Sequence, residues 1–510
     1  MNAPAKSSAA PVAHRGLITI SVMLATFMQA LDTTIANVAL GHMQGSLSAT
    51  QDEMTWVLTS YIVAAAIMTP LSGWLAGRFG RKRVLVYSVT GFVISSALCG
   101  IATDLDQIVI YRLLQGLAGA ALVPMSQAIL LDINPPERQG QAMAMWGLGV
   151  TLAPVLGPVL GGYLTDNYSW RWVFYINVPV GILALVGILT FVKDTAERRL
   201  AGFDFFGFGA LSVGIGALQM MLDRGELKDW FGSTEIVIEA TLAALGFYLF
   251  VVRTATADHP FIRPALFKDR NFVTGNIFMF VIGILLFASL VLIPPIFQGL
   301  LDYPVVTTGI IMAPRGLGTM VSMILVGRLI GKIDTRIFLA VGFSLSALSL
   351  WQMTNFNLQM DRWPMIWSGL IQGFGIGFAY VALASATFAT LAPALRAEGA
   401  AFFNLMRNIG SSVGISAVQA LLTENTQIVH STLAENVTPF NPLIAHSFNL
   451  QSAGALARLN GIVTSQAAMV AYIDDFKLMM IVSLAALPLL LFMRAGGQTG
   501  GKADPPVALE

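Results

Sequence analysis

Charged side chains are scarce in this sequence, because Asp, Glu, Lys and Arg make up only 11% of its 510 residues. Soluble domains carry roughly 25% charged residues, so this composition excludes an ordinary soluble protein. Hydrophobic residues make up 55% of the chain, and its mean hydropathy is +0.72. The composition therefore predicts an all-α polytopic membrane protein, surrounded by the lipid bilayer.

Several chemical signatures are also missing. Cys99 is the single cysteine, so no intrachain disulfide can form. The sequence has no H-E-x-x-H zinc motif, and the nearest approach to a nucleotide-binding loop, GGQTGGK at 496–502, lacks the following Ser or Thr. These absences argue against a membrane-embedded enzyme and against an ATP-driven pump. We expect no cofactor, no metal ion and no nucleic-acid partner.

Long apolar stretches recur along the whole chain. About 20 apolar residues are needed to cross a hydrocarbon core of roughly 30 Å. The first stretch exceeds a signal-peptide core and no small-residue cleavage pattern follows it, so we expect it to remain in the protein. The length rule predicts fourteen transmembrane helices, near 17–38, 54–76, 84–102, 107–131, 141–164, 173–192, 203–222, 235–252, 272–293, 305–327, 337–355, 364–389, 400–422 and 476–493.

The distribution of basic residues supports this count. If the helices alternate in direction, 20 of the 29 Lys and Arg residues lie on the side of both chain ends, and only 6 lie on the opposite side. The other three, Arg112, Arg315 and Arg407, lie in or at the ends of helices. Basic loops remain on the cytoplasmic side of a membrane. The sequence therefore predicts that both termini are cytoplasmic.

Two pairs of similar segments suggest an internal repeat. LLQGLAGAAL resembles LIQGFGIGFA at an offset of 257 residues, and LAGRFGRK resembles LVGRLIGK at an offset of 250. This similarity favours two homologous six-helix bundles with two further helices inserted between them. The expected parts are a cytoplasmic tail (1–16), a first bundle (17–192), an inserted pair (203–252), a second bundle (272–493) and a second cytoplasmic tail (494–510).

The first apolar stretch contains a carboxylate, Asp32, far in sequence from any Lys or Arg. An ionised Asp at the centre of a membrane helix costs about 2.5–3.5 kcal/mol, so the side chain is expected to face the protein interior. Burial disfavours the charged form, which suits a proton carrier. The alternative is a structural acid that is hydrogen-bonded to Thr33, Thr34 or Asn37.

Arg112 is the natural candidate for a partner of Asp32. Gln115, Gly116 and Gly119 follow it at helical spacing, and the glycines allow another helix to approach closely. A guanidinium near Asp32 would favour the ionised carboxylate, and its departure would release the carboxylate to protonation. The alternative is that Arg112 extends to the outer membrane surface.

The segment 141–164 has a face made of small residues. Pro154 and Pro158 in the same segment remove backbone hydrogen bonds and are expected to bend the helix. A face without bulky side chains forms a groove in which another helix packs tightly. The small residues recur every four positions and are Gly149, Ala153, Gly157 and Gly161.

A series of motifs resembles the major facilitator superfamily, and within it the fourteen-helix drug:proton antiporters of the EmrB type. The motifs cover the chain in order: LDTTIANVAL (31–40), GWLAGRFGRKR (73–83), YRLLQGLAGAA (111–121), APVLGPVLGGYL (153–164), LDRGELKDWF (222–231) and AYIDDF (471–476). The resemblance implies the major-facilitator fold and export of amphipathic toxic compounds, driven by protons, through alternating access. The alternatives are export of one specific metabolite or siderophore and, from another class, a membrane-embedded enzyme or receptor.

The resemblance also suggests roles for individual residues. Asp32 and Arg112 are the expected proton-coupling pair, and Asn37, Gln115 and Arg407 are candidate substrate contacts. Arg407 would bind an anionic substrate, pair with an acid or extend to the cytoplasm. Arg315 is a similar case. The expected gating and conformational residues are Gly73, Arg78, Gly80, Arg81, Asp132, Gly149, Ala153, Pro154, Gly157, Pro158, Gly161 and Gly162.

One position departs from the family pattern. Gly77 stands where the loop between the second and third helices usually carries an acidic residue. The resemblance implies that this loop locks the cytoplasmic side, so here the lock is expected to be weaker or to use Arg78, Arg81 and Asp132 alone. The resemblance also makes the groove around Gly157 a hinge and seal between the two halves.

The outer segment 424–475 is far longer than a simple connection needs to be. Its first half is expected to continue the preceding helix as far as Pro439 and Pro442. Its second half is expected to form an amphipathic helix, whose apolar face would be Leu456, Leu459, Val463, Ala467 and Val470. The resemblance implies a bacterial inner-membrane protein, with a periplasmic adaptor docked here that leads to an outer-membrane channel. The alternative is a cap that packs only on its own bundle.

Overall fold

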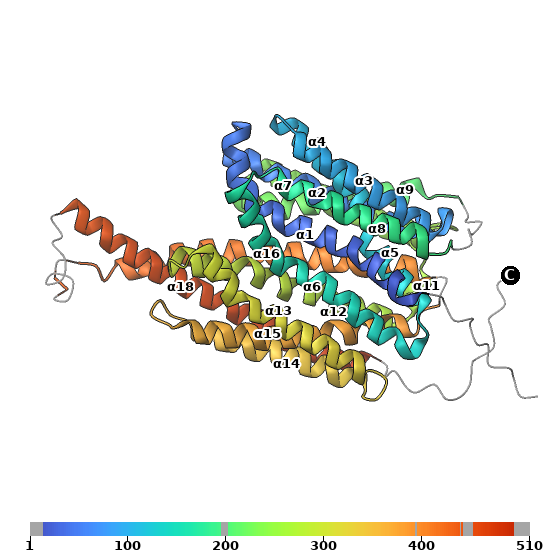
Figure 1. Ribbon diagram of the computed structural model, residues 1–510. Coiled ribbons are helices and arrows are strands. Elements are labelled where there is room, and N and C mark those ends of the chain that lie inside the picture. The colour runs from blue at the N-terminus through green and yellow to red at the C-terminus, as the bar shows by residue number, and fades with distance from the viewer. Residues whose placement is uncertain (1–13, 195–201, 393–394, 439, 442–451, 494–510) are drawn as a thin grey trace, which may run out of the picture.

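The computed structural model describes residues 14–194, 202–392, 395–438, 440–441 and 452–493. These residues form long helices that lie side by side along one direction (Figure 1), and their only bridge pairing joins Ile330 to Ile333. The first part contains α1 (Arg15–Leu47), α2 (Gln51–Phe79), α3 (Arg81–Ile101), α4 (Leu105–Gly119), α5 (Leu122–Ile133), α6 (Pro136–Asn167), α7 (Trp172–Tyr175) and α8 (Asn177–Phe191).

The rest of the chain continues the same architecture. The middle part contains α9 (Phe205–Arg224), the 3-10 turns η1 (Glu226–Lys228) and η2 (Trp230–Gly232), α10 (Thr234–Thr256) and α11 (Ala265–Lys268). The last part contains α12 (Arg270–Pro295), the π-helical turn η3 (Ile296–Leu300), α13 (Val305–Leu329), α14 (Thr335–Met353), α15 (Arg362–Ala389), α16 (Arg396–Ala434), α18 (Ala453–Ala486) and η5 (Leu487–Phe492).

Each of the fourteen predicted segments overlaps a helix, which confirms the predicted number of segments. Two of the segments are broken, between α4 and α5 and between α7 and α8. Pro124 and Pro179 follow these breaks and cannot donate a backbone hydrogen bond to the preceding turn. Within the described residues, twelve helices are long and apolar enough to cross a membrane, and α6 and α16 are not among them.

The helices pack as two six-helix bundles. In the first, α1 packs on α6 and α8, and α4 packs on α2 and α3; in the second, α15 packs on α13 and α14, and α16 packs on α12 and α18. The bundles meet where α6 lies against α13 and α15, and where α16 lies against α2 and α5. Since α6 and α16 are covered by helices of both bundles, they need fewer apolar side chains than helices that face lipid.

The inserted helices α9 and α10 pack on each other at the side of the two bundles. The α9 helix also contacts α2 of the first bundle and α16 of the second. Thr59 of α2 donates a hydrogen bond to Asp223, and Ser412 of α16 donates to Gln219 Oε1 at 2.8 Å. Polar contacts therefore connect this one helix to both halves of the molecule.

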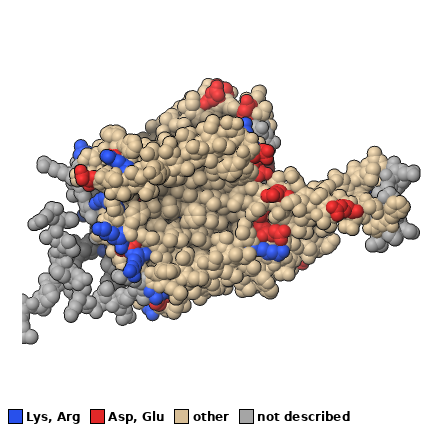
Figure 2. Space-filling model, turned by 180° about the vertical axis from the view of Figure 1, so that it is seen from behind, with Lys and Arg blue, Asp and Glu red and all other residues tan. Residues whose placement is uncertain are grey.

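The two ends of the bundle differ in charge. Figure 2 shows Lys and Arg side chains gathered at one end and Asp and Glu side chains gathered at the other. We call the first the basic end, and it holds the turn between α2 and α3. We call the other the hairpin end, because α16 and α18 extend beyond the bundle there (Figure 1).

A glycine with positive φ forms the basic-end turn in each bundle. Gly80, between α2 and α3, has φ 86°, and Gly331, between α13 and α14, has φ 88°. Residues with a Cβ rarely adopt this backbone conformation, so both turns require glycine. The matching turns support the internal repeat that the sequence suggested.

The extension at the hairpin end differs from the predicted loop in two respects. The α16 helix ends at Ala434, and Pro439 and Pro442, the predicted stops, lie outside the described residues. The second half is helical as expected, but α18 runs without a break from Ala453 to Ala486, so the amphipathic helix and the last span are one element.

The predicted apolar face of this helix was partly wrong. Leu459 and Ala467 are buried, whereas Leu456 and Val470 are exposed. The two extended helices contact each other, and His430 Nε2 lies 3.0 Å from Asn460 Oδ1. Since only a partner helix covers this part of α18, one narrow stripe of its surface is buried.

Candidate functional site

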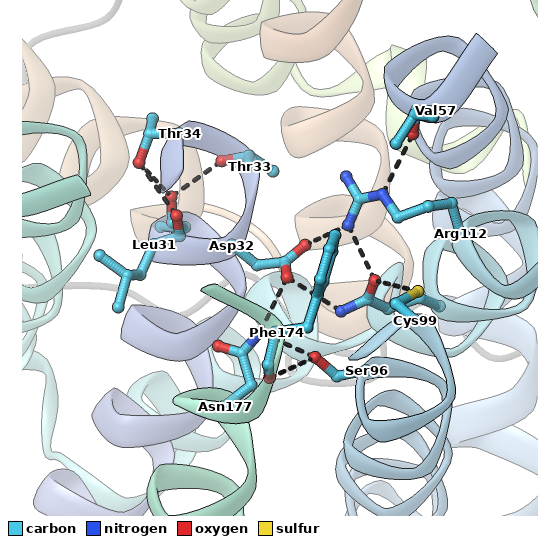
Figure 3. A network of polar contacts seen from close by, with 12 residues as sticks. Leu31, Asp32, Thr33, Thr34, Val57, Ser96, Cys99, Arg112, Phe174 and Asn177 are labelled. Atoms are coloured by element: carbon cyan, nitrogen blue, oxygen red, sulfur yellow. Dashed lines mark hydrogen bonds and ion pairs between the residues drawn. The ribbon is translucent and has the colours of Figure 1, made fainter. Parts of the chain in front are cut away.

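Asp32 lies in the middle of α1 and is completely buried. Its Oδ2 atom accepts a hydrogen bond from Arg112 Nη1 at 2.6 Å. Its Oδ1 atom accepts from Gln115 Nε2 at 3.0 Å and from Asn177 Nδ2 at 2.8 Å. Figure 3 shows Asp32, Arg112 and Asn177 converging from α1, α4 and α8. The predicted partnership of Asp32 with Arg112 is present.

Arg112 is held inside the bundle by several contacts. Its Nη1 atom also donates to Gln115 Oε1 at 2.8 Å, and its Nε atom donates to the backbone oxygen of Val57 at 3.1 Å. The guanidinium carbon lies 4.2 Å from the ring centroid of Tyr61, a cation–π arrangement. The side chain is fully buried and does not extend to the membrane surface.

A further layer of hydrogen bonds orients these residues. Asn177 Nδ2 also donates to Ser96 Oγ at 3.0 Å, and Ser96 Oγ donates to the backbone oxygen of Phe174 at 2.9 Å. The Cys99 thiol lies 3.7 Å from Gln115 Oε1. We call Asp32, Ser96, Arg112, Gln115 and Asn177 the Asp32 cluster.

The alternative in which neighbours on α1 hold Asp32 is wrong for this structure. Thr33 and Thr34 donate to backbone oxygens, and Thr34 also reaches the oxygen of Ala153 at 3.5 Å. Asn37 is exposed and outside the cluster. All three hydrogen-bond partners of Asp32 are donors, so each of these contacts uses a carboxylate oxygen as the acceptor.

A second set of charged contacts lies at the basic end. Arg81 forms an ion pair with Asp132, as the predicted lock requires. Asp132 also lies 3.7 Å from Arg396 of α16, so this contact crosses between the two bundles. Arg78 is exposed, and Arg396 is a member of this set that no sequence motif indicated.

The glycines at the basic end have distinct structural roles. A Cβ added to Gly73 would lie 2.7 Å from Glu398 Cα of α16, so glycine lets the two bundles touch there. Gly80 supplies the positive φ of the turn described above. The predicted lock at this end therefore lies beside a close backbone contact between the two bundles.

The small-residue face of α6 packs against α1 of the same bundle. A Cβ on Gly157 would lie 2.8 Å from Thr34 Cβ, one on Gly161 would lie 3.0 Å from Ile35 Cγ1, and one on Gly149 would lie 3.4 Å from Met23 Cε. The groove exists, but it does not line the boundary between the halves.

Other positions of α6 form that boundary. Gly140 packs against Ile330, the residue that follows α13, and a Cβ on Gly147 would lie 2.9 Å from Met323 Sδ of α13. A Cβ on Gly162 would meet nothing within 4 Å. The backbone is helical at Pro154 and Pro158, whose side chains lie outside the described part of the structure.

The candidate substrate contacts do not gather at one place. Gln115 belongs to the Asp32 cluster, whereas Asn37 is exposed on α1. Arg407 lies in α16, is only 9% exposed, and lies 3.4 Å from Asn408 Oδ1. Burial excludes extension of Arg407 to the cytoplasm in this structure. Among the described residues, no carboxylate oxygen lies within ion-pair distance of Arg407.

Sequence reasoning missed several members of the site. Asn177 and Ser96 are polar residues within otherwise apolar stretches, which is the signal that would have identified them. Tyr61 is a similar case in α2. Groups of three His, Cys, Asp or Glu residues that would hold a metal ion do not occur in the described part of the chain.

Comparison with known proteins agrees with this architecture. A family model described as Major Facilitator Superfamily matches residues 22–415. This chain belongs to the major facilitator superfamily, whose fold is that of membrane transporters. It is 34% identical over 503 residues to multidrug export protein EmrB of Escherichia coli (strain K12), a match that covers 95% of this chain and 97% of the relative.

Other relatives and solved structures give the same result. The chain is 35% identical over 492 residues to fatty acid resistance protein FarB of Neisseria gonorrhoeae, covering 95% of this chain and 97% of the relative. The fold also resembles the proton:xylose symporter XylE, with a TM-score of 0.60, 14% identity, and coverage of 92% of this chain and 95% of that one. The human organic anion transporter MFSD10 has a TM-score of 0.58 at 13% identity, with coverage of 92% of this chain and 99% of that one. At such low identity, the two structures support the fold alone.

Proposed function

We propose that the chain is a proton-coupled multidrug efflux antiporter that exports amphipathic small molecules by alternating access. The observation that carries this proposal is the Asp32 cluster, in which a carboxylate inside a membrane bundle is held by Arg112 and two amides. The names of relatives such as multidrug export protein EmrB support the multidrug activity. A transporter of this family is not expected to catalyse covalent chemistry on its substrate.

The cluster supplies a simple coupling step. While Arg112 contacts Asp32, the carboxylate stays ionised; when a proton from the hairpin side neutralises it, the main attraction that holds the guanidinium is lost. The released Arg112 and the neutral Asp32 then favour the alternate state, which discharges the proton at the basic side. One proton supplies about 2.3 kcal/mol per 100 mV, enough for roughly fiftyfold accumulation of substrate.

The basic-end contacts are the proposed gate on one side of this cycle. Arg81, Asp132 and Arg396 form a charged chain between the bundles, and Gly73 allows α2 to touch α16. Opening this end requires separation of Asp132 from Arg396. The glycine groove of α6 would then serve as a close-packed hinge between α6 and α1 within one bundle, with Ala153 and Gly157 at its centre.

We assign the protein to a bacterial inner membrane, with both termini in the cytoplasm. The concentration of Lys and Arg at the basic end supports this orientation (Figure 2). The packing of the helices supports residues 17–192 and 272–493 as the two bundles and residues 203–252 as the inserted pair. The hairpin end then faces the periplasm.

The extended helices at the hairpin end are the proposed docking surface for a periplasmic adaptor that leads to an outer-membrane channel. Their exposed apolar side chains support this proposal, because a surface in water exposes few large apolar groups without a partner. The helices extend beyond the bundle rather than lying on it (Figure 1), which weighs against a simple cap. The exposed residues on these helices are Ile428, Leu456 and Ile462, and Phe440 is exposed in the segment after α16.

Export of one chemical class is the second candidate function. The relative FarB is named as a fatty acid resistance protein, and its similarity extends over 95% of this chain. A protein dedicated to fatty-acid-like anions would lack activity on cationic drugs. A broad exporter would act on both kinds of molecule.

Proteoliposomes test the proposed function directly. Purified protein is reconstituted with an imposed proton gradient, and the uptake of a cationic dye, a neutral drug and a fatty acid is compared with and without an uncoupler. We expect uncoupler-sensitive transport of at least two chemically different compounds. Transport of the fatty acid alone supports the second candidate, and uncoupler-insensitive transport contradicts proton coupling.

The docking proposal needs experiments in cells as well as in vesicles. Replacement of residues 430–465 by a short Gly/Ser linker should preserve transport in proteoliposomes and abolish both drug resistance and adaptor crosslinking in cells. A milder variant, Leu456→Ser with Ile462→Ser, keeps the hairpin and removes only its exposed apolar surface. Full cellular resistance and crosslinking in both variants would refute docking, and loss of vesicle transport would indicate a cap.

A further inference from the structure

The second bundle contains a counterpart of the Asp32 cluster. An offset of 257 residues, taken from the similar segments, places Gln115 on Gln372 and Asp32 on Ser289. In the structure, Gln372 Nε2 of α15 donates to Ser289 Oγ of α12 at 3.1 Å, as Gln115 donates to Asp32. The repeat therefore preserves the polar contact and replaces the carboxylate with a hydroxyl.

The arginine of this counterpart comes from a different helix. Gly373 packs against the backbone oxygen of Arg315 in α13, just as Gly116 packs against the backbone oxygen of Tyr61 in α2. Arg315 therefore occupies the position of Tyr61. Gly369 occupies the position of Arg112, and a Cβ added there would lie 3.7 Å from Arg315 Cβ. The missing side chain at Gly369 leaves space beside Arg315.

Among the described residues, Arg315 lacks a carboxylate partner such as the one that Asp32 provides for Arg112. Its side chain is only 6% exposed, and its Nη2 atom lies 3.2 Å from the backbone oxygen of Leu286 and 3.4 Å from Ser289 Oγ. Within the described ranges, Nη1 has no hydrogen-bond partner and no carboxylate oxygen lies within 4.0 Å. The amide oxygen of Gln372 also has no partner there.

An unpaired charge is costly at such a position. Removing a guanidinium from water without an opposite charge costs several kcal/mol, and the Asp32 cluster avoids this cost with a carboxylate. Arg315 also lines a small, mostly apolar cavity of about 10 Å³ between α12, α13, α14 and α15, which has room for about one water-sized group. The walls include Ile293, Phe297, Met312, Met353 and Phe356.

We propose that the Nη1 of Arg315, unpartnered within the described part of the chain, binds a monovalent anion beside Gln372 and Ser289, whose hydroxyl itself donates to the backbone oxygen of Leu285. The anion takes the place that the Asp32 carboxylate has in the first bundle and bonds to the free Nη1 of Arg315. Two sources fit this chemistry: a small inorganic anion such as chloride, and the carboxylate of an amphipathic substrate, whose apolar part enters only if the Met and Phe side chains around the cavity move apart. The carboxylate source rests on the proposed function, whereas the chloride source does not.

Calorimetric titration of the full-length protein in nanodiscs tests the site. Chloride, decanoate and uncharged decanol are titrated at constant ionic strength in methanesulfonate buffer. We expect saturable binding of chloride or decanoate, and at least tenfold weaker binding by Arg315→Gln. Lys332→Gln, which removes the same charge from an exposed position, should bind like the wild type. Decanol should not distinguish the variants.

A second variant gives an answer even if Arg315→Gln does not fold. Ser289→Asp places a carboxylate where Asp32 lies in the first bundle, so Arg315 gains an internal partner. This variant should unfold at a higher temperature than the wild type and lose anion binding at least tenfold. Unchanged binding of both anions by Ser289→Asp, or no saturable binding of either anion by the wild type, overturns the site.

The two anions separate the possible sources. Binding of decanoate but not chloride identifies a carboxylate site, and binding of chloride but not decanoate identifies an inorganic-anion site. Failure of the proposed function appears differently, because a wild-type protein that binds an anion but shows no uncoupler-sensitive transport overturns only the transport proposal.

Discussion

The two bundles contain equivalent polar clusters, but among the described residues the buried arginine is paired with a carboxylate in only one of them. In the first, Arg112 is matched by Asp32 at 2.6 Å; in the second, Arg315 faces Ser289 at 3.4 Å and has no carboxylate nearby in the described residues. The amide contact is nearly identical, at 3.0 Å from Gln115 and 3.1 Å from Gln372. The difference shows that the same scaffold, as far as the structure describes it, holds an internal anion beside the arginine in one copy and leaves the buried arginine of the other copy without one.

Asp32→Asn removes the charge on which this comparison rests and should have the largest effect. The asparagine cannot exchange a proton, so substrate-driven proton release in proteoliposomes should fall below detection, about 100-fold or more. Arg112 would then be buried without a counter-charge, which destabilises a protein by about 3–5 kcal/mol when the other contacts remain. Proton release and thermal unfolding are therefore measured on the same preparation.

Ser289→Asn is the matched control for Asp32→Asn. It introduces the same amide at the equivalent position without removing a charge, and proton release driven by a cationic substrate, which the proposed anion site does not bind, should persist. If Asp32→Asn folds and still releases protons when substrate is added, Asp32 has a structural role only.

Arg112→Lys tests whether the geometry of the charge matters. A lysine keeps the attraction to Asp32 but cannot donate at once to Asp32, Gln115 and the oxygen of Val57 in a planar arrangement. We expect the initial rate of drug transport to fall about 10- to 100-fold, because loss of one or two charge-assisted hydrogen bonds costs about 1.5–3 kcal/mol. Wild-type rates in this variant would show that charge alone is sufficient.

Gly116→Ala and Gly373→Ala test the equivalence of the two bundles by packing. In each case the new Cβ overlaps the backbone oxygen of the adjacent helix, at Tyr61 or at Arg315. Overpacking of this kind costs about 1–3 kcal/mol, so both variants should unfold at lower temperature by similar amounts. Gly162→Ala, which would meet nothing within 4 Å, is the neutral control. Clearly unequal losses would contradict the structural match.

Arg396→Gln should have the smallest effect, and it concerns the boundary between the bundles. The ion pair with Asp132 is 3.7 Å long and partly exposed, so its removal should cost at most about 1 kcal/mol. Accessibility of a cysteine introduced at the basic end should rise by a few fold, because the closed state is slightly weakened. No change in accessibility would assign closure of this end to backbone packing at Gly73.

The sequence predicted the features that follow from how rarely charged residues occur in its apolar helices. A lone acid and a lone arginine in apolar helices must face inward, so Asp32 and Arg112 are identifiable from their sequence context alone. The number of spans followed from apolar length. These inferences need only the local sequence and the properties of the bilayer.

Other features depend on the relative rotation of helices. The sequence indicated a small-residue groove around Gly157 but not that α1 fills it. A helix of either bundle could pack into such a groove. Asn177 joins Asp32 only because α8 presents that turn to α1. The offset of 257 residues pairs Asp32 with Ser289, so the sequence already shows that the second bundle lacks the carboxylate. It does not show where Arg315 lies.

The α9 helix has a mechanical consequence for a cycle in which the bundles rotate against each other. Thr59 anchors one part of this helix to the first bundle, and Ser412 anchors another part to the second. A rigid helix cannot follow two bodies that move apart, so every turnover must break one anchor and keep the other. In such a cycle the inserted pair α9 and α10 moves with the bundle whose hydrogen bond to α9 stays intact.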